Sequence, residues 1–128
     1  VFVDAVDPSL GGRAGSVVVL EVEPERPGGR SKRLPSLDPH EVNPAALASL
    51  LMAMGYVKGR ALVVRVVPER VGLGGPLSEV VLRSVPRLLR TLRACLRELG
   101  ATPSWDDRCM AEAIKRLARG GASGGGRA

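Results

Sequence analysis

Aromatic side chains are scarce in this sequence, since only Phe2, Tyr56 and Trp105 occur in 128 residues. Valine, leucine and alanine must therefore build the core, and nucleic-acid bases would find few rings to stack on. No stretch approaches the roughly 18 apolar residues of a membrane span, and no charged-then-apolar leader marks a secretion signal. We therefore expect a cytoplasmic protein without a membrane partner.

Cysteine and side-chain amides are also rare. Cys95 and Cys109 fall in separate expected helices without Cys-x-x-Cys spacing, which argues against a zinc site or a thioredoxin-like pair and favours small buried side chains. Glutamine is absent and Asn43 is the only asparagine. Depletion of thermolabile amides is typical of proteins from hot environments.

Charge is unevenly distributed along the chain, whose net charge is +6. Residues 1–82 hold nine Lys or Arg and nine Asp or Glu, whereas residues 83–128 hold ten and four. The length predicts one domain over residues 1–119, followed by a flexible glycine-rich tail over residues 120–128. Any basic surface belongs to the C-terminal part of the chain.

Hydrophobic periodicity predicts an α/β fold. The first two strands are separated by too few residues for a helical crossover, so they are either antiparallel or not neighbours. The later strand, helix and strand read as a βαβ unit with a parallel pair. The expected strands span residues 1–6, 16–22 and 60–67, and the expected helices span residues 43–55, 78–99 and 107–117.

Asp4 interrupts the first strand, which otherwise reads as buried. A buried carboxylate costs several kcal/mol or more unless hydrogen bonds, a cation or a metal ion compensate it. Two interpretations are open: Asp4 caps a turn or meets a buried arginine, or it belongs to a functional site near the carboxyl end of its strand.

His40, the only histidine, precedes the first expected helix. A loop histidine is often merely solvated, but imidazole is also the commonest metal ligand. If its loop leaves the sheet at the edge where Asp4 lies, the two form a partial ligand set for Zn²⁺ or Ni²⁺. Such a site needs a third ligand, for which Asp7, Asp38 and Glu41 are the local candidates.

Arginines occupy one face of the helix expected over residues 78–99. The opposite face is apolar, so a solvated surface is the favoured interpretation, and phosphate binding is the alternative. The sequence contains no nucleic-acid-binding motif, and nucleic acid is not an expected partner. The arginines are Arg83, Arg87, Arg90, Arg93 and Arg97, and the apolar residues are Val81, Val85, Leu88, Leu89, Leu92 and Leu96.

Taken in order, four segments followed by a leucine-rich helix resemble the hydrogenase maturation proteases. The resemblance covers about residues 1–99. These endopeptidases remove the C-terminal extension of the large subunit of nickel-iron hydrogenases after nickel insertion. The segments are "VFVDAVDP", "GRAGSVVVLE", "DPHEVNPAALASLLMAMG" and "VVRVVPERVGLGGPLSEVV".

The resemblance implies a three-layer α/β/α sandwich with a mostly parallel sheet. It also implies that Asp4 and His40 are catalytic residues and metal contacts, which recognise nickel already seated in the large-subunit precursor. The cofactor would thus be supplied by the substrate, and metal polarisation of a carbonyl or a water molecule would drive hydrolysis.

The chain departs from the family at its start. Family members begin with a strand, a Gly-Asn loop rich in acidic residues and a helix, and this segment supplies a third, carboxylate ligand. That strand and helix have no counterpart in this sequence, so we expect a fragment or a misplaced start that is inactive by itself. The alternative is a non-catalytic module that uses its basic C-terminal helix on an acidic partner or nucleic acid.

Overall fold

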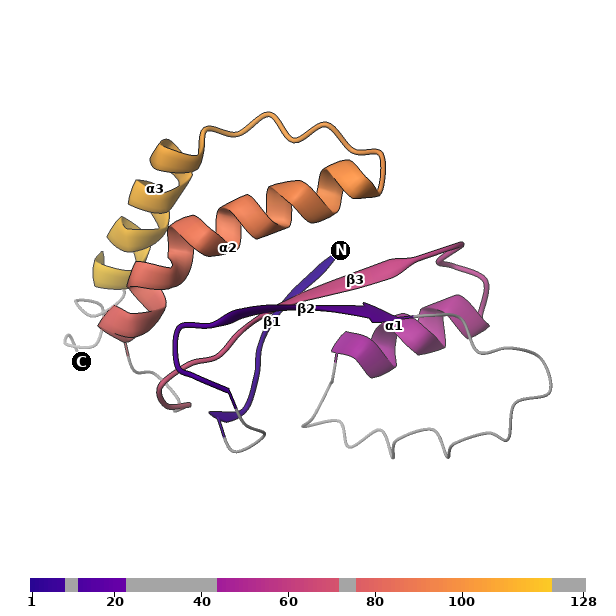
Figure 1. Ribbon diagram of the computed structural model, residues 1–128, viewed down its shortest axis with the longest axis horizontal. Coiled ribbons are helices and arrows are strands. Elements are labelled where there is room, and N and C mark those ends of the chain that lie inside the picture. Colours follow the sequence, from indigo (N-terminus) through magenta and orange to yellow (C-terminus); the bar gives the residue numbers. More distant parts are fainter. Residues whose placement is uncertain (9–11, 23–43, 72–75, 121–128) are drawn as a thin grey trace, which may run out of the picture.

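The computed structural model describes residues 1–8, 12–22, 44–71 and 76–120. These residues form three strands and three helices (Figure 1). Every expected element is present, with bounds close to those predicted except that the last helix continues beyond Leu117. The elements are β1 (Phe2–Ala5), β2 (Val17–Val22), α1 (Pro44–Ala53), β3 (Ala61–Val66), α2 (Glu79–Glu98) and α3 (Asp107–Gly120).

The sheet has the order β1-β3-β2, so the first two strands are not neighbours, which is one of the two alternatives that the sequence left open. β1 pairs with β3 in parallel, but β2 pairs with β3 in antiparallel. The predicted βαβ unit with a parallel pair is therefore wrong, and the described sheet is mixed rather than mostly parallel. A strand–helix–strand order does not set strand direction here, because more than thirty residues separate β2 from β3 and can return the chain in either direction.

Helices cover both faces of the central strand, as Figure 1 shows. On one face, Ala48 of α1 packs with Ala61 and Val63 of β3. On the other, Leu62 and Val64 pack with Cys95 of α2. Because both faces are covered, the strand is apolar almost throughout. The mixed α/β class is confirmed, whereas the finer three-layer sandwich stays a prediction.

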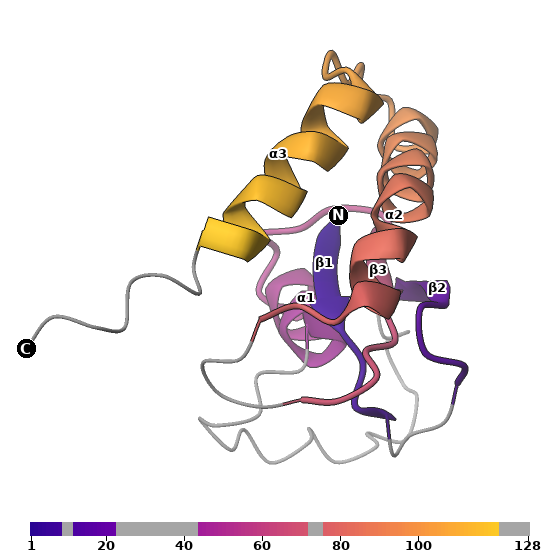
Figure 2. The ribbon, with the colours of Figure 1, turned by 90° about the vertical axis from the view of Figure 1, so that its left-hand side faces the viewer.

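α2 and α3 form a helical pair above the sheet (Figure 2). Ser78 caps α2, since its side chain accepts a hydrogen bond from the Val81 backbone N–H at 3.4 Å. The helix continues through Pro86, and its residues Val85 and Leu89 pack against Ala111 and Ile114 of α3. Among the helices that the structure describes, none combines the length and apolarity needed to cross a membrane.

Candidate functional site

Asp4 lies on the face of the sheet that α1 covers. Side chains alternate along a strand, so Asp4 shares its face with Phe2. Phe2 packs against the buried cluster that contains Ala48 of α1. The partner of Asp4 in the strand register is Arg65 of β3. Because β1 and β3 are parallel, both residues lie near the same carboxyl edge, where ligands of α/β sheets commonly bind. The Asp4 side chain keeps 30% of its surface accessible, so a ligand could reach the carboxylate.

Arg65 is the cation that faces Asp4. Its Nε lies 3.8 Å from Asp4 Oδ2, which is longer than a hydrogen bond but close enough for ionic attraction. Asp4 therefore meets an arginine, as one of the two interpretations had it. A signal was present in the sequence, because Asp4 and Arg65 are the only charged residues in their strands. That they pair depends on the register, which the sequence did not reveal.

His40 lies outside the described residues, and so do Asp38 and Glu41. The convergence of His40 with Asp4 stays a prediction. α1, the helix that follows His40, runs beneath the sheet with its N-terminal end on the side at which β1 and β3 finish (Figure 1). Asp7, the remaining local candidate for a third ligand, is exposed just after β1.

Within residues 1–8, 12–22, 44–71 and 76–120, no group of three or more His, Cys, Asp or Glu side chains could hold a metal ion. Cys95 is buried, as expected, and desolvation raises the pKa of its thiol. Cys109 is exposed, contrary to expectation, because it lies in the first turn of α3 away from Ala111, which packs against α2.

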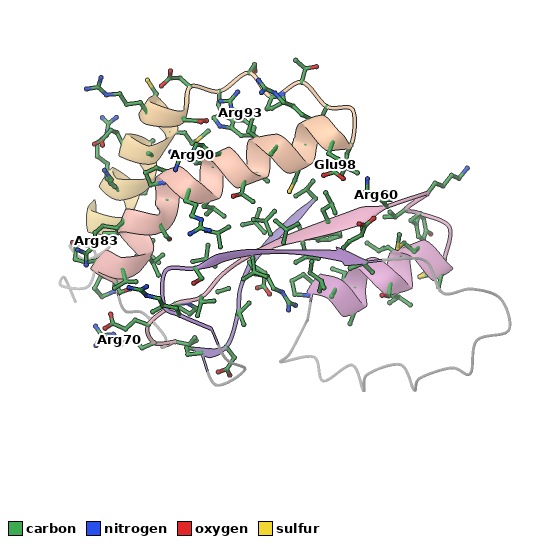
Figure 3. The ribbon with its side chains drawn as sticks, viewed as in Figure 1. Arg60, Arg70, Arg83, Arg90, Arg93 and Glu98 are labelled. Atoms are coloured by element: carbon green, nitrogen blue, oxygen red, sulfur yellow. The ribbon has the colours of Figure 1, made fainter. Side chains whose placement is uncertain are left out.

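The arginine face of α2 is exposed at four of its five positions, Arg83, Arg87, Arg90 and Arg97. On the apolar face, Val85 and Leu89 are buried, while Leu88, Leu92 and Leu96 are half-buried. Figure 3 shows Arg83 at the N-terminal end of the helix. The solvated-face interpretation therefore describes this surface with one exception.

Arg93 is the exception, because only 20% of its side chain is accessible. The connection to α3 folds back over it, so that the guanidinium donates hydrogen bonds to the carbonyls of Pro103 and Trp105. It also donates to Asp107 Oδ1 at 2.7 Å and lies 5.0 Å from the centre of the Trp105 ring. The hydrogen bond from Arg93 is the main reason that the pKa of Asp107 is lowered. Arg93 therefore joins α2 to α3.

A second arginine cluster, which no local sequence pattern predicts, joins three segments of the fold. Arg60 precedes β3 and pairs with Glu21 of β2 and with Glu98 at the end of α2 (Figure 3). The hydrogen bond from Arg60 lowers the pKa of Glu21. These groups are all solvent-accessible, so the cluster is a surface ion-pair network rather than a site for chemistry.

The chain matches no protein-family model, no curated protein and no solved structure.

Proposed function

We propose that this chain is a hydrogenase maturation endopeptidase, which removes the C-terminal extension of a nickel-iron hydrogenase large subunit after nickel insertion. The motif resemblance over residues 1–99 motivates the proposal. The observation that carries it is the position of Asp4, an accessible carboxylate at the carboxyl edge of a parallel strand pair. The three-layer α/β/α sandwich and a cytoplasmic location belong to the same proposal.

In this proposal, Asp4 and His40 contact the nickel of the large-subunit precursor. The nickel is part of the substrate, and it supplies a Lewis acid close to the peptide bond that is cut. Arg65 has a positioning role, because its charge beside Asp4 Oδ2 offsets the cost of holding the carboxylate partly buried. Outer partners of this kind orient the carboxylates that bind metals.

The test is proteolysis of a nickel-loaded large-subunit precursor. The protein is expressed with whatever coding sequence precedes Val1 in its gene, and the mass of the large subunit is measured before and after incubation. We expect a single truncation at its C-terminus. Asp4→Asn and His40→Ala should abolish it, whereas the matched control Asp106→Asn, which makes the same change at an exposed position before α3, should retain it. If the Asp4→Asn and His40→Ala variants both still truncate the large subunit, neither residue takes part in the mechanism.

A folding control accompanies Asp4→Asn, because the variant removes the carboxylate that Asp4 offers to the Arg65 guanidinium as a partner. If Asp4 acts only as that partner, Asp4→Asn should lower the melting temperature and activity together. If it contacts nickel, activity should be lost in the fraction that remains folded. A variant that is fully folded and fully active would contradict both roles.

The exposure of Arg83, Arg87, Arg90 and Arg97 favours a second candidate function, a non-catalytic binding module. Such a module would hold an acidic protein or nucleic acid along the whole arginine face of α2, with an affinity that falls steeply as salt rises. Binding of a single-stranded oligothymidylate tests it. The module requires all four arginines to contribute about equally, whereas the endopeptidase requires none of them.

A further inference from the structure

A cavity of about 560 Å³ lies between the turn at Arg13–Ser16 and the first two turns of α2. The turn contributes Arg13, Ala14, Gly15 and Ser16, and the helix contributes Val80, Arg83, Ser84 and Arg87. The four helix residues lie on one side because they are spaced three or four apart. The volume of the cavity is similar to that of small-molecule sites, but the cavity is a hollow open to solvent rather than an enclosed pocket.

The described lining of the cavity is cationic. Arg13, Arg83 and Arg87 line it, and none of the described residues that line it is acidic. Elsewhere arginines have carboxylate partners, as Arg60 has Glu21 and Arg93 has Asp107. Within the part of the chain that the structure describes, the three cavity arginines form no ion pair with a carboxylate.

This arrangement is unfavourable for the free protein. Like charges four residues apart on a helix repel, as Arg83 and Arg87 do, and Arg13 brings a third positive charge to the same hollow. Negative charge is favoured near the start of α2, because the helix dipole is positive there, and Glu79, four residues before Arg83, supplies part of it. A bound anion would relieve the repulsion, which is an energetic reason to expect one.

The turn is held rigidly enough to position Arg13. Gly15 donates a backbone hydrogen bond to the Val67 carbonyl at 2.7 Å, and the Val67 N–H donates to the Ser16 carbonyl at 2.9 Å. Gly15 has a φ of +81°, and a Cβ on it would lie 2.9 Å from Val80 Cγ1. Only glycine lets the turn approach α2 this closely without strain. The turn that carries Arg13 is therefore held in place beside α2 by hydrogen bonds and close packing.

We propose that this cavity binds a small molecule that carries two or more phosphate groups. Guanidinium groups match phosphate oxygens with paired hydrogen bonds, and three of them from two elements can surround more than one phosphate. Of the three aromatic residues, Phe2, Tyr56 and Trp105, none lines the cavity, so recognition rests on the phosphates rather than on stacking of a base. The site is separate from Asp4 and does not depend on the proposed endopeptidase function.

The experiment is calorimetric titration of the full chain with sodium pyrophosphate at low ionic strength. We expect saturable binding of one pyrophosphate per chain. Arg13→Gln, Arg83→Gln and Arg87→Gln should each weaken it about tenfold, since each removes charge-assisted hydrogen bonds. The matched control is Arg90→Gln, which removes the same charge from an exposed position of the same helix outside the cavity and should change affinity less than about twofold. Circular dichroism melts confirm that each variant is folded.

Three results would overturn the proposal. If the parent chain does not bind pyrophosphate, the cavity is not a phosphate-binding site. An equal loss in Arg90→Gln would show diffuse attraction to the whole arginine face. A hexaglutamate peptide that binds more tightly than pyrophosphate, with the same dependence on Arg83 and Arg87, would assign the cavity to an acidic peptide instead. Because no outcome involves proteolysis, failure here leaves the endopeptidase proposal unaffected.

Discussion

Replacing Arg93 by alanine should destabilise the protein far more than replacing Arg90, three residues earlier on the same helix. Both were expected on the solvated face of α2, but the structure covers Arg93 with the connection to α3 and leaves Arg90 exposed. Arginine and alanine are both good helix formers, so intrinsic propensity changes little in either variant. The difference between the variants therefore reports the tertiary contacts of Arg93.

The magnitude follows from the hydrogen bonds to the carbonyls of Pro103 and Trp105. A hydrogen bond with a charged partner contributes about 1.5–3 kcal/mol, and the bond to Pro103 is long at 3.4 Å. Since water can partly replace the guanidinium, we expect Arg93→Ala to cost about 2 kcal/mol in total. For a chain of this size that corresponds to a melting temperature about 6–12 °C lower. Arg90→Ala should stay within about 0.5 kcal/mol of the parent.

The assay is thermal melting followed by circular dichroism, with Arg93→Lys as a third variant. Lysine keeps the charge but lacks the planar fork that reaches two carbonyls and a carboxylate, so it should recover only part of the loss. Equal melting temperatures for the Arg90 and Arg93 variants would refute the reasoning. Full recovery by lysine would show that charge alone matters and that the hydrogen-bond geometry does not.

Three further predictions concern stability and association. The pKa of Asp107 is lowered from its usual value of 3.8, so the ion pair of Asp107 stabilises the fold fully at pH values above 3.8. This stabilisation is lost as the pH falls through the lowered pKa. The melting temperatures of the parent and Asp107→Asn should therefore differ at pH 7 and converge in acid; a constant gap would contradict this. Leu89→Ala should cost about 2–5 kcal/mol in urea unfolding, because Leu89 is 5% exposed between α2 and α3. A loss no larger than that of Leu99→Ala, an exposed control, would place Leu89 outside the core. Val19→Lys should reduce light scattering at high concentration, because Val19 is 44% exposed on the edge strand β2 and lysine discourages edge pairing; unchanged scattering would show that this edge does not associate.

The positions of the helices and strands could be predicted because their signals are local. The apolar run of β3 requires burial on both faces, and the helical spacing of leucines in α2 requires one buried side. Ser78 caps α2 through its own hydroxyl, which is also a local property. Such features depend on residues a few positions apart, so the sequence alone determined them.

The direction of β2 and the partners of two charged residues were decided by tertiary structure. Antiparallel pairing of β2 with β3 depends on how a long connection returns, and no local pattern encodes that path. Asp4 meets Arg65 only because the register places them side by side. Arg93 is covered because a distant segment folds over it, although helical periodicity assigns it to the solvent face. Periodicity shows which side chains share a face, but only packing between distant segments decides what covers that face.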